Sequence, residues 1–315
     1  MYLKKILARL GPFLGLIFVY VLFAVISPPE FLSFYNAKTI LTQTVIVGIA
    51  ALGMTLVIIS AGIDLSAGSL VSLGTVLIAI SLKAGWSPGL SAVIGVAGCA
   101  LFGLINGAVI SGFRIVPFIV TLGTMQIARG LSKYLSNEQT VVTPPNGLQQ
   151  LMLVDPTPSW LVFAPGIWVL LILLILVTLM LRYTVLGRHI FAIGSNEETA
   201  RLCGIHVKGK KMLIYTLGAA FTGVASIFQY GNLTVGDPTA AVGMELDIIA
   251  AVVIGGGSLN GGEGSAMGSI VGALIMAVLR NGCNMLGVPN YVQEIIIGFI
   301  IVGAVMVDKL KHRGA

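Results

Sequence analysis

Three stretches of this 315-residue sequence resemble sites that bind phosphate or a metal ion. The stretch "GIHVKGKK" at 204–211 comes close to the nucleotide-binding pattern G-x-x-x-x-G-K-[ST], but Lys211 stands where the Mg²⁺-binding hydroxyl belongs. The stretch "IGGGSLNGGEGSAMG" at 254–268 is rich in glycine and fits G-x-G-x-x-G in no register. Cys203 and His206 are three residues apart, and two possible ligands do not make a metal site. We therefore predict no cofactor and no metal in this chain, with any ATP and Mg²⁺ bound by a different subunit.

Other catalytic signatures are also missing. The sequence contains no H-E-x-x-H, and its three cysteines show no C-x-x-C spacing. We predict no catalytic residues, which disfavours a membrane enzyme.

Several polar side chains lie inside strongly apolar stretches. Uncharged groups of this kind suit a hydroxylated solute, whereas an ion path uses carboxylates or arginines inside the membrane, a role open here to Glu294 and Arg129. Hydrogen bonding between helices is the alternative for each of them. The residues that we predict to line a substrate path are Thr121, Thr124, Gln293, Glu294, Asn106 and Asn281.

The stretch "SAGIDLSAGS" at 60–69 places a carboxylate between two apolar spans. A charged side chain facing lipid is costly, so Asp64 must lie at a turn or in a cavity. One interpretation makes Asp64 and Ser66 part of a gate. The other makes them a turn and N-cap that satisfy free amides of the following helix.

The stretch "AIGSNEETARLCGI" at 192–205 is the most polar part of the chain and predicts a short helix. Asn196 is a good N-cap, Glu197 and Glu198 suit the positive end of the helix, and Gly204 is placed to follow its last turn. A helix of about two turns is unstable alone in water, so it must rest on another surface.

These residues have to be positioned by membrane-spanning helices. Hydrophobic residues make up 57% of the chain and charged residues 10%, and apolar runs of about 20 residues match the thickness of a bilayer. We predict an all-α polytopic membrane protein, a single transmembrane domain over 1–315, in which the eighth span is short enough to be a half-length helix. The ten predicted spans are 11–28, 40–60, 65–83, 89–112, 116–135, 161–182, 211–231, 246–258, 264–286 and 291–307.

The basic residues predict the orientation. With both termini in the cytoplasm, 13 of the 18 lysines and arginines fall on the inner side, where membrane proteins carry an excess of basic residues. The loop at 136–160 then lies outside and the loop at 183–210 lies inside. Because the net charge of +6 comes from the ends of spans, it does not indicate a nucleic-acid surface.

A weak internal repeat relates the two halves of the chain. Residues 89–107 align without gaps on 264–282, pairing two Asn-Gly steps, and a proline follows each copy. The copies would cross the membrane in opposite directions, which is a common plan in transporters. We place the first repeat at about 40–135 and the second at about 211–307.

The chain resembles a known family over essentially its whole length. The motifs "LGMTLVIISAGIDLSAGS", "VPFIVTLGTMQIARG", "GRHIFAIGSNEETARLCGI" and "ELDIIAAVVIGGGSLNGGEG" are similar to those of the permeases of ribose-type monosaccharide ATP-binding-cassette (ABC) importers. Ala67 and Gly257 are small departures from the family pattern, which more often has valine and threonine there. The resemblance implies the vitamin-B12-importer-like (type II) permease fold in a bacterial inner membrane. It also implies import of ribose or a similar pentose, hexose or polyol.

The resemblance further implies partners and roles. The partners are a cytoplasmic ABC ATPase, commonly with two fused cassettes, a periplasmic sugar-binding protein and a second permease subunit. The central passage of the dimer is lined by the fifth and tenth spans. The short polar helix, which begins after Gly194, docks in a groove of the ATPase, with Leu202 and Ala200 packed in the groove and Arg201 and Glu198 orienting it. An ion-coupled secondary transporter of a small polar solute remains the alternative.

Overall fold

The computed structural model describes residues 2–158 and 160–312 and is built from helices, with one minimal strand pair. Each of the ten predicted spans falls on one of its ten principal helices. These helices are α1 (Tyr2–Ile26), α2 (Phe34–Ile59), α3 (Ala67–Lys83), α4 (Pro88–Phe113), α5 (Pro117–Leu135), α6 (Pro165–Tyr183), α9 (Val207–Leu233), α10 (Met244–Ile254), α11 (Ala266–Met285) and α12 (Asn290–His312). The smaller elements are η1 (Pro29–Leu32), β1 (Val141–Val142), η2 (Gly147–Met152), α7 (Val185–Ser195), α8 (Glu197–Leu202) and β2 (Val235–Gly236).

The helices confirm an all-α polytopic membrane protein. In the described part of the chain, α2, α4, α6, α9 and α11 are each long and apolar enough to cross a membrane, and shorter apolar stretches lie in α1, α3 and α12. The eighth predicted span is short, because α10 has only 11 residues and ends at the run of three glycines from Gly255 to Gly257. Glycine destabilises a helix interior, so the run ends α10 before a full crossing.

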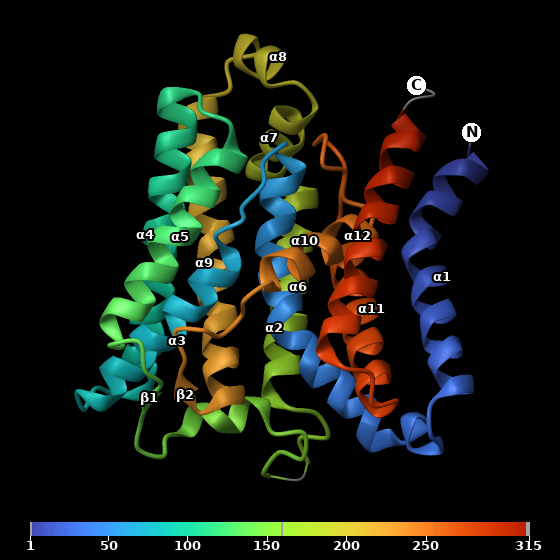
Figure 1. The fold of residues 1–315 in the computed structure, drawn as a ribbon. Helices are drawn as coiled ribbons and strands as arrows, with labels where there is room; N and C mark the ends of the chain where they lie inside the picture. The colour runs from blue at the N-terminus through green and yellow to red at the C-terminus, as the bar shows by residue number, and fades with distance from the viewer. Residues whose placement is uncertain (1, 159, 313–315) are drawn as a thin grey trace.

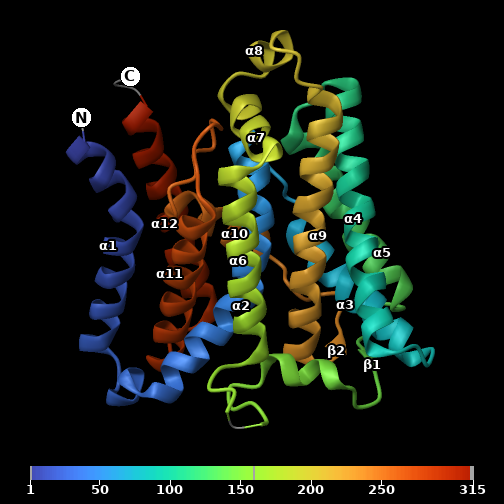
Figure 2. The same cartoon turned by 180° about the vertical axis from the view of Figure 1, so that it is seen from behind.

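The core is centred on α2, which packs against α9 and α11. Of the 18 most apolar consecutive residues in each helix, 89% are buried in α2 and 83% in α11, against 33% in both α4 and α6. A helix that is apolar on all sides is either buried inside the protein or faces lipid. Here α2 and α11 are of the buried kind, whereas most of these residues in α4 and α6 are at least partly exposed. In Figures 1 and 2, α1 lies at one edge of the bundle beside α11 and α12, while α4 and α5 form the opposite edge.

The two ends of the bundle differ in what they carry. Figure 1 shows α8 and both chain termini at one end, and the long segment between α5 and α6 at the other. We call these the α8 end and the loop end. This arrangement agrees with the prediction that the termini and the loop at 183–210 share one side, while the orientation in a bilayer stays a prediction.

The helices proposed as repeat partners run in opposite directions. The end of α4 lies at the α8 end, where Arg114 and Glu197 line the same cleft. The start of α11 also lies at the α8 end, because Gly262, shortly before it, contacts Ser195. These directions are the ones that an inverted repeat needs, and the boundaries of the repeats stay a prediction.

Between α6 and α9 the structure holds two helices where the sequence analysis placed a loop with one. Thr184 caps α7, since its hydroxyl oxygen accepts a hydrogen bond from the Gly187 N–H at 3.1 Å. Ile190 and Ile193 of α7 are buried against the bundle. This helix provides the surface from which α8 projects (Figures 1 and 2).

Candidate functional site

The short polar helix α8 forms as its capping residues predict. The Asn196 side chain accepts a hydrogen bond from the Thr199 N–H at 2.8 Å, and Glu197 and Glu198 occupy the first turn. Gly204 adopts φ +84° just after the last turn, and its N–H donates to the Arg201 carbonyl at 3.0 Å. Glycine reaches this left-handed conformation without strain, which explains why the helix ends there.

The two apolar side chains of α8 lie on different faces. Leu202 is 84% exposed and points away from the bundle. Ala200 is only 4% exposed, because it packs in a small cluster with Ile193 of α7 and Val207 of α9. Ala200 is therefore covered by its own chain, and its packing in a partner's groove stays a prediction. A helix of six residues has a single inward face, and Ala200 occupies it.

Charged side chains attach α8 to its own chain. Glu197 forms ion pairs with Arg201, four residues along, at 3.1 Å and with Lys211 of α9 at 2.5 Å. Arg201 is thus held within the chain, while Glu198 is exposed and free to meet another surface. Of the two charges expected to orient docking, Glu198 is the more available.

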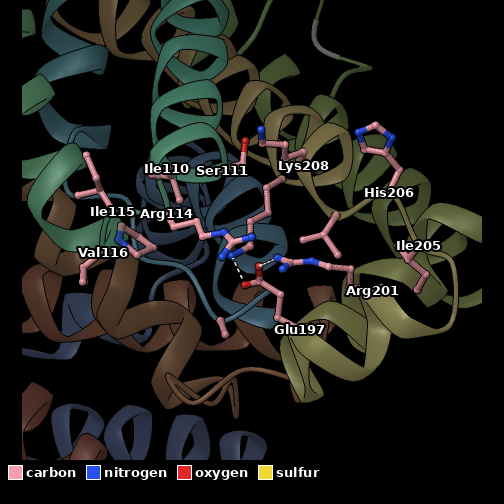
Figure 3. A pocket seen from close by; sticks show the side chains of 14 residues that line it. Ile110, Ser111, Arg114, Ile115, Val116, Glu197, Arg201, Ile205, His206 and Lys208 are labelled. Atoms are coloured by element: carbon pink, nitrogen blue, oxygen red, sulfur yellow. Dashed lines mark hydrogen bonds and ion pairs between the residues drawn. The ribbon is translucent and has the colours of Figure 1, made fainter.

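A cleft of about 590 Å³ separates α8 from the link between α4 and α5. Figure 3 shows the side chains of Arg114, Arg201 and Glu197 converging on it. Lys208 and Lys211 also line it, so that four lysines and arginines meet one carboxylate. This charge balance makes the cleft complementary to an acidic surface.

Below α8, three segments meet backbone to backbone in what we call the glycine contact, made by Ile59, Gly194, Gly261 and Gly262. The Gly262 N–H donates a hydrogen bond to the Ile59 carbonyl at 2.8 Å. A Cβ atom on Gly194 would lie 1.7 Å from that carbonyl oxygen, and one on Gly261 would lie 2.6 Å from the Gly194 carbonyl oxygen. Only glycine fits at these positions, so the predicted coupling residue Gly194 joins α7 directly to the end of α2.

The predicted gate residues lie in the turn that follows the end of α2. Asp64 is 3% exposed, and its Oδ1 accepts hydrogen bonds from the N–H and the hydroxyl of Ser66, at 2.9 and 2.5 Å. The Asn106 amide donates to the Ser66 hydroxyl oxygen at 3.3 Å. The Thr121 hydroxyl lies within hydrogen-bonding distance of the carbonyls of Ile63, at 3.3 Å, and Pro117, at 3.0 Å. Two gate residues and two path residues therefore share one polar cluster, formed by Asp64, Ser66, Asn106 and Thr121.

The other predicted path residues do not join this cluster. The Thr124 hydroxyl donates to the Thr121 carbonyl at 3.2 Å, and the Asn281 amide donates to the Asn36 side chain at 2.9 Å. Gln293 is buried and donates to the Asn284 side chain at 2.8 Å. Among the six predicted path residues, only Glu294 is exposed. Since α10 lies between α5 and α12 in Figure 1, a single chain does not bring the fifth and tenth spans together.

The sequence analysis missed an ion pair inside the bundle. Asp247 of α10 accepts a hydrogen bond from Arg280 of α11 at 2.5 Å. The two residues line a cleft of about 420 Å³ at the loop end, together with Gln43 and Asn232. In the sequence, the ion pair is indicated only by an acidic residue in the eighth span and an arginine in the ninth, which lie 33 residues apart.

Comparison with known proteins places this architecture in a family. Residues 36–305 match the family described as "Branched-chain amino acid transport system / permease component". No solved structure matches the chain.

Three relatives are similar to this chain over nearly their full length. The ribose import permease protein RbsC of Bacillus subtilis is 37% identical over 312 residues, which cover 97% of this chain and 94% of the relative. The fructose import permease protein FrcC of Rhizobium meliloti is 34% identical, over 96% of this chain and 86% of its own length. The L-arabinose ABC transporter permease protein AraH of Azospirillum brasilense is 33% identical, over 95% and 88%. The bundle of apolar helices, the family match and these relatives together show that the chain belongs to this family of transport-system permease components.

Proposed function

We propose that this chain is the membrane permease of an ABC importer and moves a monosaccharide from periplasm to cytoplasm by alternating access. The three relatives support a sugar as the substrate, since their names specify ribose, fructose and L-arabinose. Ribose is the first sugar to test, because the ribose permeases are the most similar of these relatives.

The observation that carries the proposal is the exposed Leu202 on α8. Leu202 is 84% exposed on a six-residue helix that stands outside the bundle, and a partner surface at this place would bury it. The neighbouring cleft adds an excess of positive charge that would suit an acidic rim. The partner that fits an importer is a cytoplasmic ATPase, commonly with two fused cassettes, which binds ATP and Mg²⁺.

The glycine contact gives α8 a route to the helices. Displacement of α8 would move Gly194, and with it Ile59 and Gly262, because backbone atoms this close have no rotamers that could absorb the movement. The turn after Ile59 carries Asp64 and Ser66, whose hydrogen bonds reach Asn106 of α4. Closure of the ATPase would thus shift the polar cluster and α5 together, which is the switch that alternating access requires.

The remaining partners follow from the other surfaces. A second permease subunit would cover the face formed by α5, α10 and α12, where Leu122, Leu246 and Phe299 are exposed. A periplasmic sugar-binding protein would dock at the loop end. Both termini would lie in the cytoplasm, beside the ATPase, in a bacterial inner membrane.

An ion-coupled secondary transporter is the second candidate, and the buried carboxylates favour it. Asp64 and Asp247 are both less than a tenth exposed, and buried carboxylates are the usual carriers of protons or sodium. However, Asp64 accepts a hydrogen bond from Ser66, and Asp247 forms an ion pair with Arg280. A secondary transporter also has no ATPase that would cover the exposed Leu202 and the basic cleft beside α8.

Vesicles that contain the permease, its ATPase and its binding protein test the proposal. With ATP inside, we expect uptake of at least one of D-ribose, D-fructose and L-arabinose, and no uptake with a non-hydrolysable ATP analogue. An uncoupler should leave the rate unchanged when ATP is held constant. Uptake that needs the proton gradient and not ATP would establish the second candidate instead.

A further inference from the structure

The cleft at the loop end has the size and the walls of a small-molecule site. It lies between α2, α9, α10 and α11, and its volume of about 420 Å³ falls within the range of about 300–1,000 Å³ that such sites span. Met152, Val154 and Ile46 give it apolar walls. Its polar lining residues are Thr39, Thr42, Gln43, Asn232, Asp247 and Arg280.

The ion pair in this cleft is only partly used within the chain. Arg280 binds Oδ2 of Asp247, and Oδ1 accepts no hydrogen bond from any other described residue. The Asp247 side chain is 8% exposed and that of Arg280 is 41% exposed, so the guanidinium reaches into the cleft with further N–H donors. Ionised groups within a membrane-spanning bundle face cavities and mark the path of a solute.

Two carboxamides complete a mixed set of donors and acceptors. Gln43 and Asn232 are exposed to the cleft, and neither side chain makes a hydrogen bond within the described ranges. Each offers both a donor and an acceptor. The hydroxyls of Thr39 and Thr42 donate to backbone carbonyls at 3.0 and 2.8 Å, which leaves their oxygens as acceptors.

This chemistry selects a neutral polyhydroxylated ligand. Because Asp247 and Arg280 neutralise each other, the cleft has no net charge with which to hold a free anion or cation. A sugar hydroxyl both donates and accepts a hydrogen bond, and the C–H faces of a sugar ring suit the apolar walls.

We propose that this cleft is a monosaccharide-binding subsite within each permease subunit, in addition to any passage between two subunits. Asp247, Arg280, Gln43 and Asn232 hydrogen-bond the sugar hydroxyls after the sugar leaves the binding protein. The inference rests on the proposed function as a sugar importer and adds to it a location and a set of contacts.

Uptake and ATP hydrolysis, measured together in vesicles with the complete importer, test the subsite. The informative variants are Gln43→Leu and Asn232→Leu, since both side chains are exposed and make no contact that the fold needs. Each should lower the sugar moved per ATP hydrolysed by about tenfold, the effect of about one lost hydrogen bond to a well-fitted ligand. Gln139→Leu, an exposed glutamine at the same end but outside the cleft, is the matched control and should retain the wild-type ratio.

A third variant examines the ion pair. At normal permease yield, Arg280→Ala should also lower the sugar moved per ATP hydrolysed, because it removes the guanidinium donors and leaves Asp247 without its partner. Asn232→Trp, which fills the cleft, should lower the ratio further than Asn232→Leu.

The outcomes separate this inference from the proposed function. A wild-type importer that moves none of D-ribose, D-fructose and L-arabinose refutes the proposed function. Normal wild-type uptake, with Gln43→Leu and Asn232→Leu both within twofold of it, overturns the subsite alone. Competition of sugar uptake by L-valine at equal concentration would also overturn it, because the site would then accept a zwitterion.

Discussion

The two ends of the bundle differ in how their segments meet: by close backbone contact at the α8 end, and around an open cleft at the loop end. At the α8 end, Gly194, Ile59 and Gly262 meet backbone to backbone with no space for a Cβ atom. At the loop end, side chains of four helices surround a cleft, and Gln43 and Asn232 point into it without partners among the described residues. Close backbone contact transmits movement, whereas free side-chain donors and acceptors recognise a solute. Under the two proposals above, coupling belongs to the α8 end and recognition to the loop end.

The largest effect is expected at the glycine contact. In Gly194→Ala, the new methyl group would lie 1.7 Å from the Ile59 carbonyl oxygen, so α7 must move away from α2. We expect the free energy of unfolding to fall by about 3 kcal/mol, at the upper end for overpacking, together with loss of transport. Thermal unfolding of the purified permease measures the loss.

Gly112→Ala is the matched control for this variant. Gly112 lies in α4 with open space where its Cβ would be, and alanine favours a helix over glycine by about 1 kcal/mol. We expect this variant to be at least as stable as the wild type. Equal behaviour of the two alanine variants would show that the glycine contact is no tighter than an open helix position at the same end.

The next largest effect is expected at the exposed side chain of α8. Leu202→Asp should change the stability of the isolated permease by no more than about 0.5 kcal/mol, because the side chain is already in solvent. It should weaken binding of the ATPase about 10- to 100-fold, since burial of a leucine contributes about 1.5–3 kcal/mol. A pull-down titration and ATPase stimulation by the loaded binding protein measure this effect. Thr199→Ser on the same helix serves as the control.

A smaller effect is expected at the N-cap of α8. Asn196→Ala removes the side-chain acceptor for the Thr199 N–H and should destabilise α8 by about 1 kcal/mol. Hydrogen exchange of the amides in α8 should become faster, while exchange in α10 stays unchanged. Equal acceleration at both ends would show that the ends are not independent.

The smallest effect is expected at the ion pairs of Glu197. The Glu197 side chain is 41% exposed, so Glu197→Gln should cost only about 0.5 kcal/mol, as is usual for surface pairs. Raising the salt concentration should reduce the difference from wild type, because exposed charges are screened. A difference that does not change with salt would place Glu197 in a role other than charge pairing.

The sequence predicted the helices well, because the length and composition of each apolar run are enough to identify a membrane-spanning helix. Each of the ten spans lies on a helix, and α10 is short, as the run of three glycines after it indicates. The cap of α8 was also predictable, since the contacts of Asn196 and Gly204 are local in sequence.

Contacts between distant residues could not be predicted in the same way. The pairing of Asp247 with Arg280 joins two helices, and hydropathy does not report the rotation of a span about its axis. For the same reason, the hydrogen bonds of Asn281 with Asn36 and of Gln293 with Asn284 were not predictable, while the path role of both residues stays a prediction. The inward position of Ala200 was not predictable, because six residues are too few for a periodic pattern to show the inner face.

Parallel assays of Leu202→Asp and Asn232→Leu in the same vesicles test the division between the two ends most directly. Sugar uptake and ATP hydrolysis are recorded together for each variant. Leu202→Asp should lose both activities in proportion, so that the sugar moved per ATP hydrolysed stays constant. Asn232→Leu should lower that ratio about tenfold, because recognition fails while coupling persists. Two variants that change the ratio in the same way would contradict the assignment of coupling to the α8 end and of recognition to the loop end.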